Sequence, residues 1–378
     1  MLFIKKTQTC DSLFLDRKPQ RYADERPPKQ HIRLRGKKQH VRAAGKLLHD
    51  SVKKQHASIE MASILQYMRT DSPATVPPAP DNDTHALVFR CHDPTPAALQ
   101  RIAAAADQLQ QARVAVWVSL DTTHVPEEPP SLLPILQHSP PRKKRRSAPP
   151  TPAQKVRRTL SGHIARGAIR VHEYDEADMV RRYPVLRDLK RNSRLQESEE
   201  FQRGTHSLAW GLHAEALNAW YQSLERKPSF VWCFEDDVGF SGSLETLVDI
   251  VKRDCGDADL VTADIKLRPS EAWWWLDVHS TAFAERYGDD VYISREHVQR
   301  FSMRLLDRLH VLSLQRVTCW SEALVPTIAH AEGFVVAELP RLGTPFAHDG
   351  RVTAQEWDHI TESHAGRRAD RLYHALKF

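Results

Sequence analysis

The stretch FVWCFEDDV, residues 230–238, determines how the whole chain is interpreted. Its first five residues form an uninterrupted apolar run, which indicates a buried strand. Three carboxylates follow at the point where this strand would end. Because alternate residues of a strand share a face, Glu235 and Asp237 should point in the same direction.

Two carboxylates on one face repel each other unless a cation lies between them or water surrounds them. Oxygen ligands of this kind suit Mg²⁺ or Mn²⁺, which commonly complete their coordination with phosphate oxygens. Ligands of open α/β sheets bind beyond the carboxyl ends of the strands. The stretch therefore predicts a metal–phosphate site at the edge of a sheet. The alternative is a solvated strand end that leads into the turn at residues 239–242.

The segments around this stretch predict an α/β fold. Residues 85–90 form an apolar run, and Thr95 followed by Pro96 is a typical helix start. Residues 113–120 complete a strand–helix–strand unit with the length of a right-handed crossover. Further strands are expected at 168–172, 258–262 and 334–339, and helices at 206–224, 243–253 and 296–312. We therefore expect one α/β domain with a mostly parallel sheet.

The positive charge of the chain is concentrated in two segments. The sequence has 378 residues and a formal net charge of +6. Residues 1–57 contain 15 Lys and Arg against 5 Asp and Glu, and residues 142–158 contain 8 basic residues and no acidic one. The rest of the chain is therefore acidic, which suits a cation site better than a nucleic-acid-binding face.

Composition also suggests where the domain begins. Residues 1–83 are expected to be a basic, mostly disordered region that ends in a Pro-rich linker. Residues 84–378 are expected to form the α/β domain, interrupted by an insert at 125–160 that is rich in Pro, Arg and Lys. The run RKKRR at 142–146 could be a nuclear import signal, or make weak contacts with nucleic acid or an importin. The alternative is a solvated, disordered insert.

Neither a membrane span nor a secretory leader is expected. The sequence has no run of 18 apolar residues, and its start lacks the apolar stretch of a signal peptide. Its five cysteines are scattered, which predicts neither a disulfide framework nor a cysteine metal site. On sequence alone the chain would be cytoplasmic or nuclear, with the secretory pathway left open if the N-terminus is atypical.

A hydrophobic strand that ends in Phe-Glu-Asp-Asp-Val and follows an N-terminal strand–helix–strand unit resembles the GT-A fold. This is a Rossmann-like fold of nucleotide-sugar-dependent glycosyltransferases. The Asp-x-Asp motif of that family is commonly varied to Glu-Asp-Asp. The resemblance implies that Mn²⁺ or Mg²⁺ bridges the diphosphate of a nucleotide sugar. It places Glu235 near the ribose or the metal, Asp237 on the metal, and Asp236 at the variable middle position of the donor site.

Further donor-site residues are implied by the resemblance and by order along the chain. Arg90, His92 and Asp93 end the first strand, and Asp121 ends the second, where the GT-A fold contacts the nucleotide. His348 follows the strand expected at 334–339, where many such enzymes supply a further metal ligand. The alternative for His348 is an ordinary surface histidine.

A hydroxyl acceptor needs a basic group that removes its proton. Glu322 stands alone in an apolar stretch, which raises the pKa of a carboxyl group and makes it a candidate general base. Asp289 and Asp290 are the next candidates. An alternative for Glu322 is a helix-start residue stabilised by the helix dipole. Trp273, Trp274 and Trp275 are expected to bind an acceptor sugar or, alternatively, to lie partly in the core.

Three functions remain open on the sequence. The first is a metal-dependent glycosyltransferase that moves a sugar from a nucleotide sugar to a hydroxyl acceptor on a glycan, a protein or a small molecule. The second is a Mg²⁺-dependent phosphate-processing enzyme that uses the same acidic residues. The third is a non-catalytic nuclear or nucleic-acid-associated protein that works through its basic segments.

Overall fold

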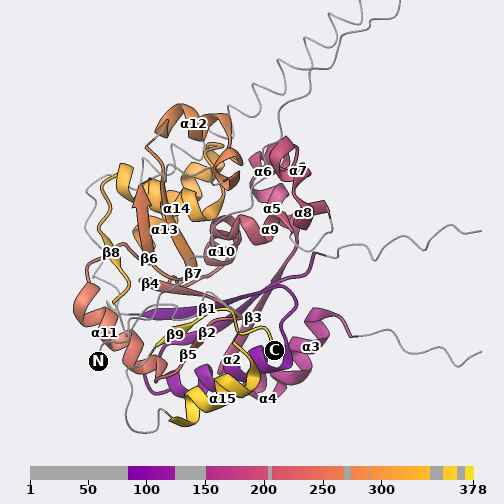
Figure 1. Ribbon diagram of the computed structural model, residues 1–378, viewed down its shortest axis with the longest axis vertical. Coiled ribbons are helices and arrows are strands. Elements are labelled where there is room, and N and C mark those ends of the chain that lie inside the picture. Colours follow the sequence, from indigo (N-terminus) through magenta and orange to yellow (C-terminus); the bar gives the residue numbers. More distant parts are fainter. Residues whose placement is uncertain are drawn as a thin grey trace, which may run out of the picture. The chain divides into compact units, whose positions relative to one another are not determined.

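The computed structural model describes residues 84–123, 150–202, 207–267, 274–288, 290–340, 352–363 and 371–378. The chain divides into two units, Met1–Thr70 and Asp71–Phe378. All described residues lie in the second unit, which is coloured in Figure 1. The predicted disorder of residues 1–83 and the basic run at 142–146 therefore lie outside the described residues.

A seven-stranded sheet forms the centre of the second unit, in the order β3-β2-β1-β4-β7-β6-β8. Its strands are β1 (His85–Cys91), β2 (Ala115–Asp121), β3 (Ile169–Tyr174), β4 (Phe230–Glu235), β6 (Leu260–Leu267), β7 (Tyr292–Ser302) and β8 (Val336–Glu338). Among these strands only β7 runs antiparallel to its neighbours, β4 and β6. The predicted α/β class with a mostly parallel sheet is thereby confirmed. A second sheet pairs β5 (Gly239–Phe240) with β9 (Leu372–Tyr373).

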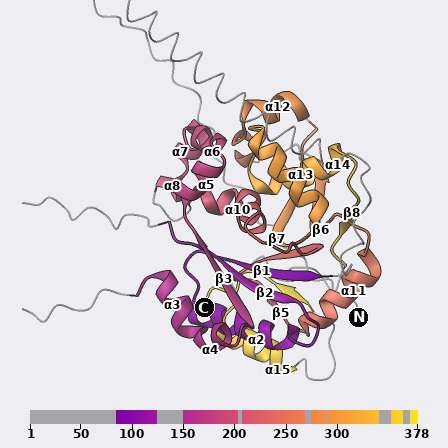
Figure 2. The ribbon, with the colours of Figure 1, turned by 180° about the vertical axis from the view of Figure 1, so that it is seen from behind.

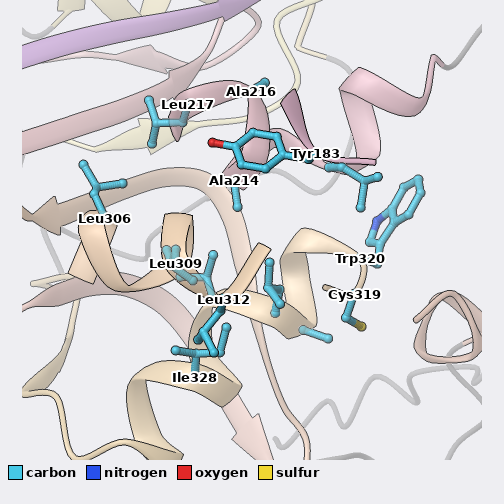
Figure 3. Close-up of a cluster of buried hydrophobic side chains, with 14 of the residues drawn as sticks. Tyr183, Ala214, Ala216, Leu217, Leu306, Leu309, Leu312, Cys319, Trp320 and Ile328 are labelled. Carbon is cyan, nitrogen blue, oxygen red and sulfur yellow. The ribbon is translucent and has the colours of Figure 1, made fainter. Parts of the chain in front are cut away.

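Helices cover both faces of the large sheet, because its strands are apolar on both sides. One face packs against helices α5 (Glu176–Arg182), α10 (His213–Tyr221), α13 (Met303–Leu314) and α14 (Ser321–Ala331). The other packs against α2 (Pro96–Leu109), α3 (Pro152–Thr159) and α11 (Leu244–Cys255). Figure 2 shows the two helical layers from behind, and Figure 3 shows Leu309 and Leu312 of α13 beside Ile328 of α14 within the first core.

Further helices accompany these two layers. They are α4 (Ser161–Ala165), α6 (Val185–Leu189), α7 (Ser193–Glu197), α8 (Glu199–Gln202), α9 (Leu208–Gly211), α12 (Thr281–Tyr287), α15 (Ala354–Ser363) and a 3₁₀ turn at Trp274–Asp277. No helix among the described residues is long and apolar enough to cross a membrane.

The strand–helix–strand unit at the start of the domain is confirmed. The Thr95 side chain accepts a hydrogen bond from the Ala98 amide, and Pro96 begins α2. The strands on either side pair in parallel, from Ala86 opposite Ala115 to Cys91 opposite Leu120. The local signals of a capping residue and a proline were therefore sufficient to place this helix.

The helix expected at 296–312 is wrong in its first half. Residues up to Ser302 belong to β7, and α13 begins at Met303, where the Ser302 side chain accepts a hydrogen bond from the Leu305 amide. Val298 and Phe301 match a helical spacing, but they pack into the two opposite cores. A strand buried between β4 and β6 is apolar on both faces, so its sequence does not show the alternation of a half-buried strand.

Two further expectations need correction. The helix expected at 206–224 is broken into α9 and α10 at Leu212, which leaves helical geometry. The break lies where the Trp320 ring packs on Gly211, because a Cβ there would be 1.8 Å from Trp320 Cη2. The insert expected at 125–160 is also too long, because its end forms α3 and buries Val156 and Leu160.

Candidate metal and nucleotide site

The acidic stretch lies at the carboxyl end of β4, as expected, between two strands that supply partners for it. Arg90 of β1 is the register neighbour of Glu235. On the other side β4 pairs with β7, and Phe234 lies opposite Val298. The next residues of the two strands are Glu235 and His297, whose side chains are in contact.

Each oxygen atom of the Glu235 carboxylate faces nitrogen atoms. Arg90 Nη2 donates a hydrogen bond to Oε1. On the other oxygen, His297 Nδ1 lies 2.7 Å from Oε2, and His374 Nε2 lies 3.3 Å from it. Burial alone would raise the pKa of Glu235, but Arg90 and the two histidines hold it well below its usual range. Glu235 is thus a buried carboxylate that stays ionised.

The two histidines and the carboxylates form a compact group of potential metal ligands. The rings of His297 and His374 are stacked, with 3.6 Å between their centroids. One ligand atom each from Glu235, His297 and His374 lies within 4.8 Å of the others. Asp237 joins them, because its Oδ1 is 3.6 Å from His374 Nε2.

Asp237 supplies the observation that tests whether this group fits a cation. Its Oδ1 is buried and accepts no hydrogen bond from the described residues. A buried carboxylate oxygen without a hydrogen bond is unfavourable, and a cation at this place would satisfy it. The group of two carboxylates and two imidazoles is a donor set that suits Mn²⁺ and other first-row divalent ions. The residues present therefore fit a metal ion.

The segment at 371–378 brings His374 to the site. It pairs with β5 through β9, and the Leu376 amide donates a hydrogen bond of 2.7 Å to the Asp237 carbonyl. The same segment places Lys377 Nζ 3.6 Å from Asp237 Oδ2. Gly239 allows Leu376 to pack this closely, because a Cβ at residue 239 would lie 2.3 Å from the Leu376 side chain.

Asp236, the middle acid, has a different environment. Its amide donates to the Arg90 carbonyl, and its own carbonyl accepts from Arg101 Nη2 at 3.1 Å. Burial, with the negative charges of Asp237 and Glu235 beside it, raises the pKa of Asp236 to about 7. The pKa of Asp236 is therefore shifted in the direction opposite to that of Glu235.

The predicted nucleotide-binding residues at the strand ends differ in accessibility. Arg90 is buried between Glu235 and Glu296, and its contact with the nucleotide stays a prediction. Asp121 is also buried and accepts hydrogen bonds from Ser207 Oγ and the Thr123 amide. His92, 3.4 Å from Asp121, and Asp93, paired with Lys155, remain partly exposed.

Glu322 lies in the first turn of α14. Burial, with the nearby charges of Glu296 and Glu235, raises its pKa to about 8. Of the other candidate bases, Asp290 is exposed in the loop before β7, and Asp289 is outside the described residues. His348 and Trp273 are also outside them, and the side chains of Trp274 and Trp275 are not described.

The sequence analysis did not identify His297 or His374. It also did not identify Glu296 and His213, two buried side chains that lie 2.6 Å apart. His297 could have been found only from the register of β4 and β7, and that strand was expected to be a helix. His374 stands far from the acidic stretch and is one of 20 histidines. No local pattern marks either as a ligand.

No protein-family model matches the sequence, and no curated protein matches it. Among solved structures, the chain is similar to the galactosyltransferase LgtC in complex with donor and acceptor sugar analogues. The identity is 12% and the TM-score 0.37, over 77% of this chain and 87% of that one. For mouse xyloside xylosyltransferase 1 the identity is 10% and the TM-score 0.37, over 78% and 98% of the two chains.

A third similar structure is the mannosyltransferase PcManGT from Pyrobaculum calidifontis in complex with GDP-Man and Mn²⁺. Its identity is 12% and its TM-score 0.33, over 77% of this chain and 65% of that one. All three of these proteins are named as sugar transferases.

Proposed function

We propose that this protein is a metal-dependent glycosyltransferase of the GT-A type, which moves a sugar from a nucleotide-sugar donor to a hydroxyl acceptor. The observation that carries the proposal is the convergence of Glu235, Asp237, His297 and His374 at the carboxyl end of β4. A parallel α/β sheet binds ligands at this end. The site therefore combines a cation-binding group with the expected position of a nucleotide.

The four side chains would hold Mn²⁺ or Mg²⁺, and the presence of two imidazoles favours Mn²⁺. When bound, the ion would neutralise charge on the diphosphate of the donor. Lys377 is more than half exposed next to Asp237, so its ammonium group is placed to contact the same phosphates. His92 and Asp93 are the accessible groups at the neighbouring strand end and would face the nucleoside.

Glu322 is the proposed general base. A base must be near the reacting centre and must have a pKa close to the working pH. Two observations support this role: the charges of Glu296, His297 and Glu235 act on Glu322, and burial raises its pKa to about 8. Its role would be to accept the proton of the acceptor hydroxyl as that oxygen attacks the sugar.

Product analysis with a panel of nucleotide sugars and Mn²⁺ tests this proposal. A glycosyltransferase releases a nucleoside diphosphate from one donor, and the release increases when the right hydroxyl acceptor is added. Release of a nucleoside monophosphate and a sugar phosphate would instead identify the Mg²⁺-dependent phosphate-processing alternative. Failure of every donor to bind or react in the presence of metal would contradict both.

A further inference from the structure

A row of buried charged and polar side chains leads away from Glu235 into the protein. Arg90 contacts Glu235 Oε1, and its two terminal nitrogens each lie 3.4 Å from Glu296 Oε1. Glu296 Oε2 is 2.6 Å from His213 Nδ1. His213 Nε2 in turn lies 3.1 Å from Gln299 Oε1. The row thus connects the candidate metal ligand on β4 with strand β7 and helix α10.

Fold stability alone does not explain this row. The side chains of Arg90, Glu296 and His213 are 4%, 8% and 0% exposed. Burying several charged groups is unfavourable, and apolar side chains of similar volume often stabilise a core equally well or better. The cores on both sides of the sheet are otherwise largely apolar. A role in function would explain why these charged side chains are buried here.

Arg90 forms ion pairs with two carboxylates at once, and this arrangement affects Glu235. Its guanidinium lies between two carboxylates, Glu235 and Glu296. If Arg90 had no second partner, its whole charge would act on Glu235 and compete with any cation for that carboxylate. Glu296 draws part of this charge away, and His213 lies against the carboxylate of Glu296. Glu235 is then held by one oxygen and directs the other, Oε2, toward His297 and His374.

We propose that Glu296 and His213 are positioning residues that set the divalent-metal affinity of Glu235 through Arg90. This inference rests on the proposed function, since it assumes that Glu235 binds the ion. It concerns residues that would touch neither the metal nor the substrate. Second-layer partners of metal ligands typically change metal affinity by about 10- to 100-fold, and we expect a loss of that size when Glu296 loses its charge.

The test measures Mn²⁺ affinity directly, by EPR titration of free Mn²⁺ in the presence of the full-length protein. The variant is Glu296→Gln, which keeps the size of the side chain and removes its charge. The matched control is Glu215→Gln. Glu215 is also a buried glutamate, two residues from His213 on α10, but its partners are Ser313 and Thr318 in the helical core. Thermal unfolding of the metal-free proteins checks that both variants are folded.

The inference is supported if E296Q binds Mn²⁺ about 10- to 100-fold more weakly than the wild type while E215Q binds it equally well. Wild-type affinity in E296Q overturns it and leaves the proposed function intact. A wild-type protein that binds no Mn²⁺ overturns the proposed function together with this inference. Should E296Q fail to fold, His213→Asn replaces it, because that variant alters the contact with Glu296 and keeps the Glu296 carboxylate. Unchanged Mn²⁺ affinity in H213N then overturns the inference.

Discussion

Glu235 stays ionised in the protein interior because charged and polar groups surround both of its oxygen atoms. Burial opposes its ionisation, but Arg90 on one oxygen and two histidines on the other keep its pKa low. A cation that approaches beside Asp237 would therefore meet a carboxylate from which no proton must be removed. Burial lowers the pKa of His297, but the hydrogen bond and charge of Glu235 raise it overall, so a metal ion that binds this imidazole must displace its proton and should bind more tightly as pH rises.

The first prediction concerns Asp237. UDP or GDP is expected to stabilise the protein against thermal unfolding only when Mn²⁺ or Mg²⁺ is present. Ligand at 100 times its dissociation constant should add about 2.7 kcal/mol. Asp237→Asn should abolish this gain, because the amide removes a negative charge from the metal-binding group. Asp307→Asn is the control, since Asp307 pairs with Lys227 on another part of the protein. Equal stabilisation of wild type and D237N would contradict the metal site.

The second prediction concerns Glu322. Glu322→Gln should lower turnover by about 100-fold or more, because general-base catalysis typically contributes about 10²–10⁴. Binding of the nucleotide sugar, measured by calorimetry, should be retained. Loss of donor binding with unchanged turnover of bound donor would place Glu322 in the donor site. Unchanged turnover would exclude it as the base.

The raised pKa of Glu322 leads to a third prediction. A general base works in its ionised form, so the rate should rise with pH through the pKa, which is about 8 in the metal-free protein. A divalent cation beside Glu235 favours the ionised form and should move this limb of the pH–rate profile below pH 8. The limb should be absent in Glu322→Gln. A profile of the same shape in that variant would assign the limb to another group.

How far the sequence could define the site depends on the kind of signal. Glu235 and Asp237 were predictable because a strand and its carboxylates are adjacent in the chain. The apolar stretch around Glu322 predicted a raised pKa, and the pKa is raised to about 8, chiefly by burial; the role of Glu322 as the base stays a prediction. His297 was not predictable, because its place depends on the register between β4 and β7. Arg90 was noticed as a strand end, but its burial follows only from the pairing of β1 with β4 and the proximity of Glu296.

At the scale of secondary-structure elements, local signals located the strands and helices that have caps or prolines. The Thr95 cap fixed α2, whereas nothing local marked the change from β7 to α13 at Ser302. Strand β7 is central and apolar on both faces, so only its tertiary position distinguishes it from a helix. The short strand β9 was also missed, because two residues carry no periodicity.

The pairing of β5 with β9 leads to the fourth prediction. Gly239→Ala would place a Cβ 2.5 Å from the Trp357 ring and 2.3 Å from Leu376. Such overpacking typically costs about 1–3 kcal/mol. The strain should loosen the segment that carries His374, so Mn²⁺ affinity should fall while the large sheet remains folded. Isothermal titration calorimetry and circular dichroism measure the two effects.

Gly162→Ala is the matched control for this variant, because no atom lies within 4 Å of a Cβ at that glycine of α4. It should bind Mn²⁺ with wild-type affinity. If G239A also binds Mn²⁺ normally, the segment at 371–378 does not hold a metal ligand in place.

At the scale of the whole molecule, the basic and the acidic residues are concentrated in different parts of the sequence. The basic residues at 1–57 and 142–158 account for the positive net charge, while the rest of the chain is acidic. An acidic body is suited to a divalent cation, and it disfavours direct binding of nucleic acid. Any contact with nucleic acid or an importin should therefore depend on the basic segments alone and weaken with salt.

The last prediction concerns the boundary of the domain. Deleting residues 1–80 should lower the melting temperature by less than about 2 °C, which corresponds to under about 1 kcal/mol for a domain of this size. The reason is that the sequence of residues 1–80 carries no periodic apolar face, whereas the Thr84 carbonyl, which the deletion keeps, accepts hydrogen bonds from the Ser229 and Phe230 amides. Differential scanning calorimetry measures the change. A deletion to residue 88 is the comparison, because it removes half of a strand that pairs with both β2 and β4, and it should prevent folding. A large loss of stability in the shorter deletion would show that part of residues 1–80 packs against the domain.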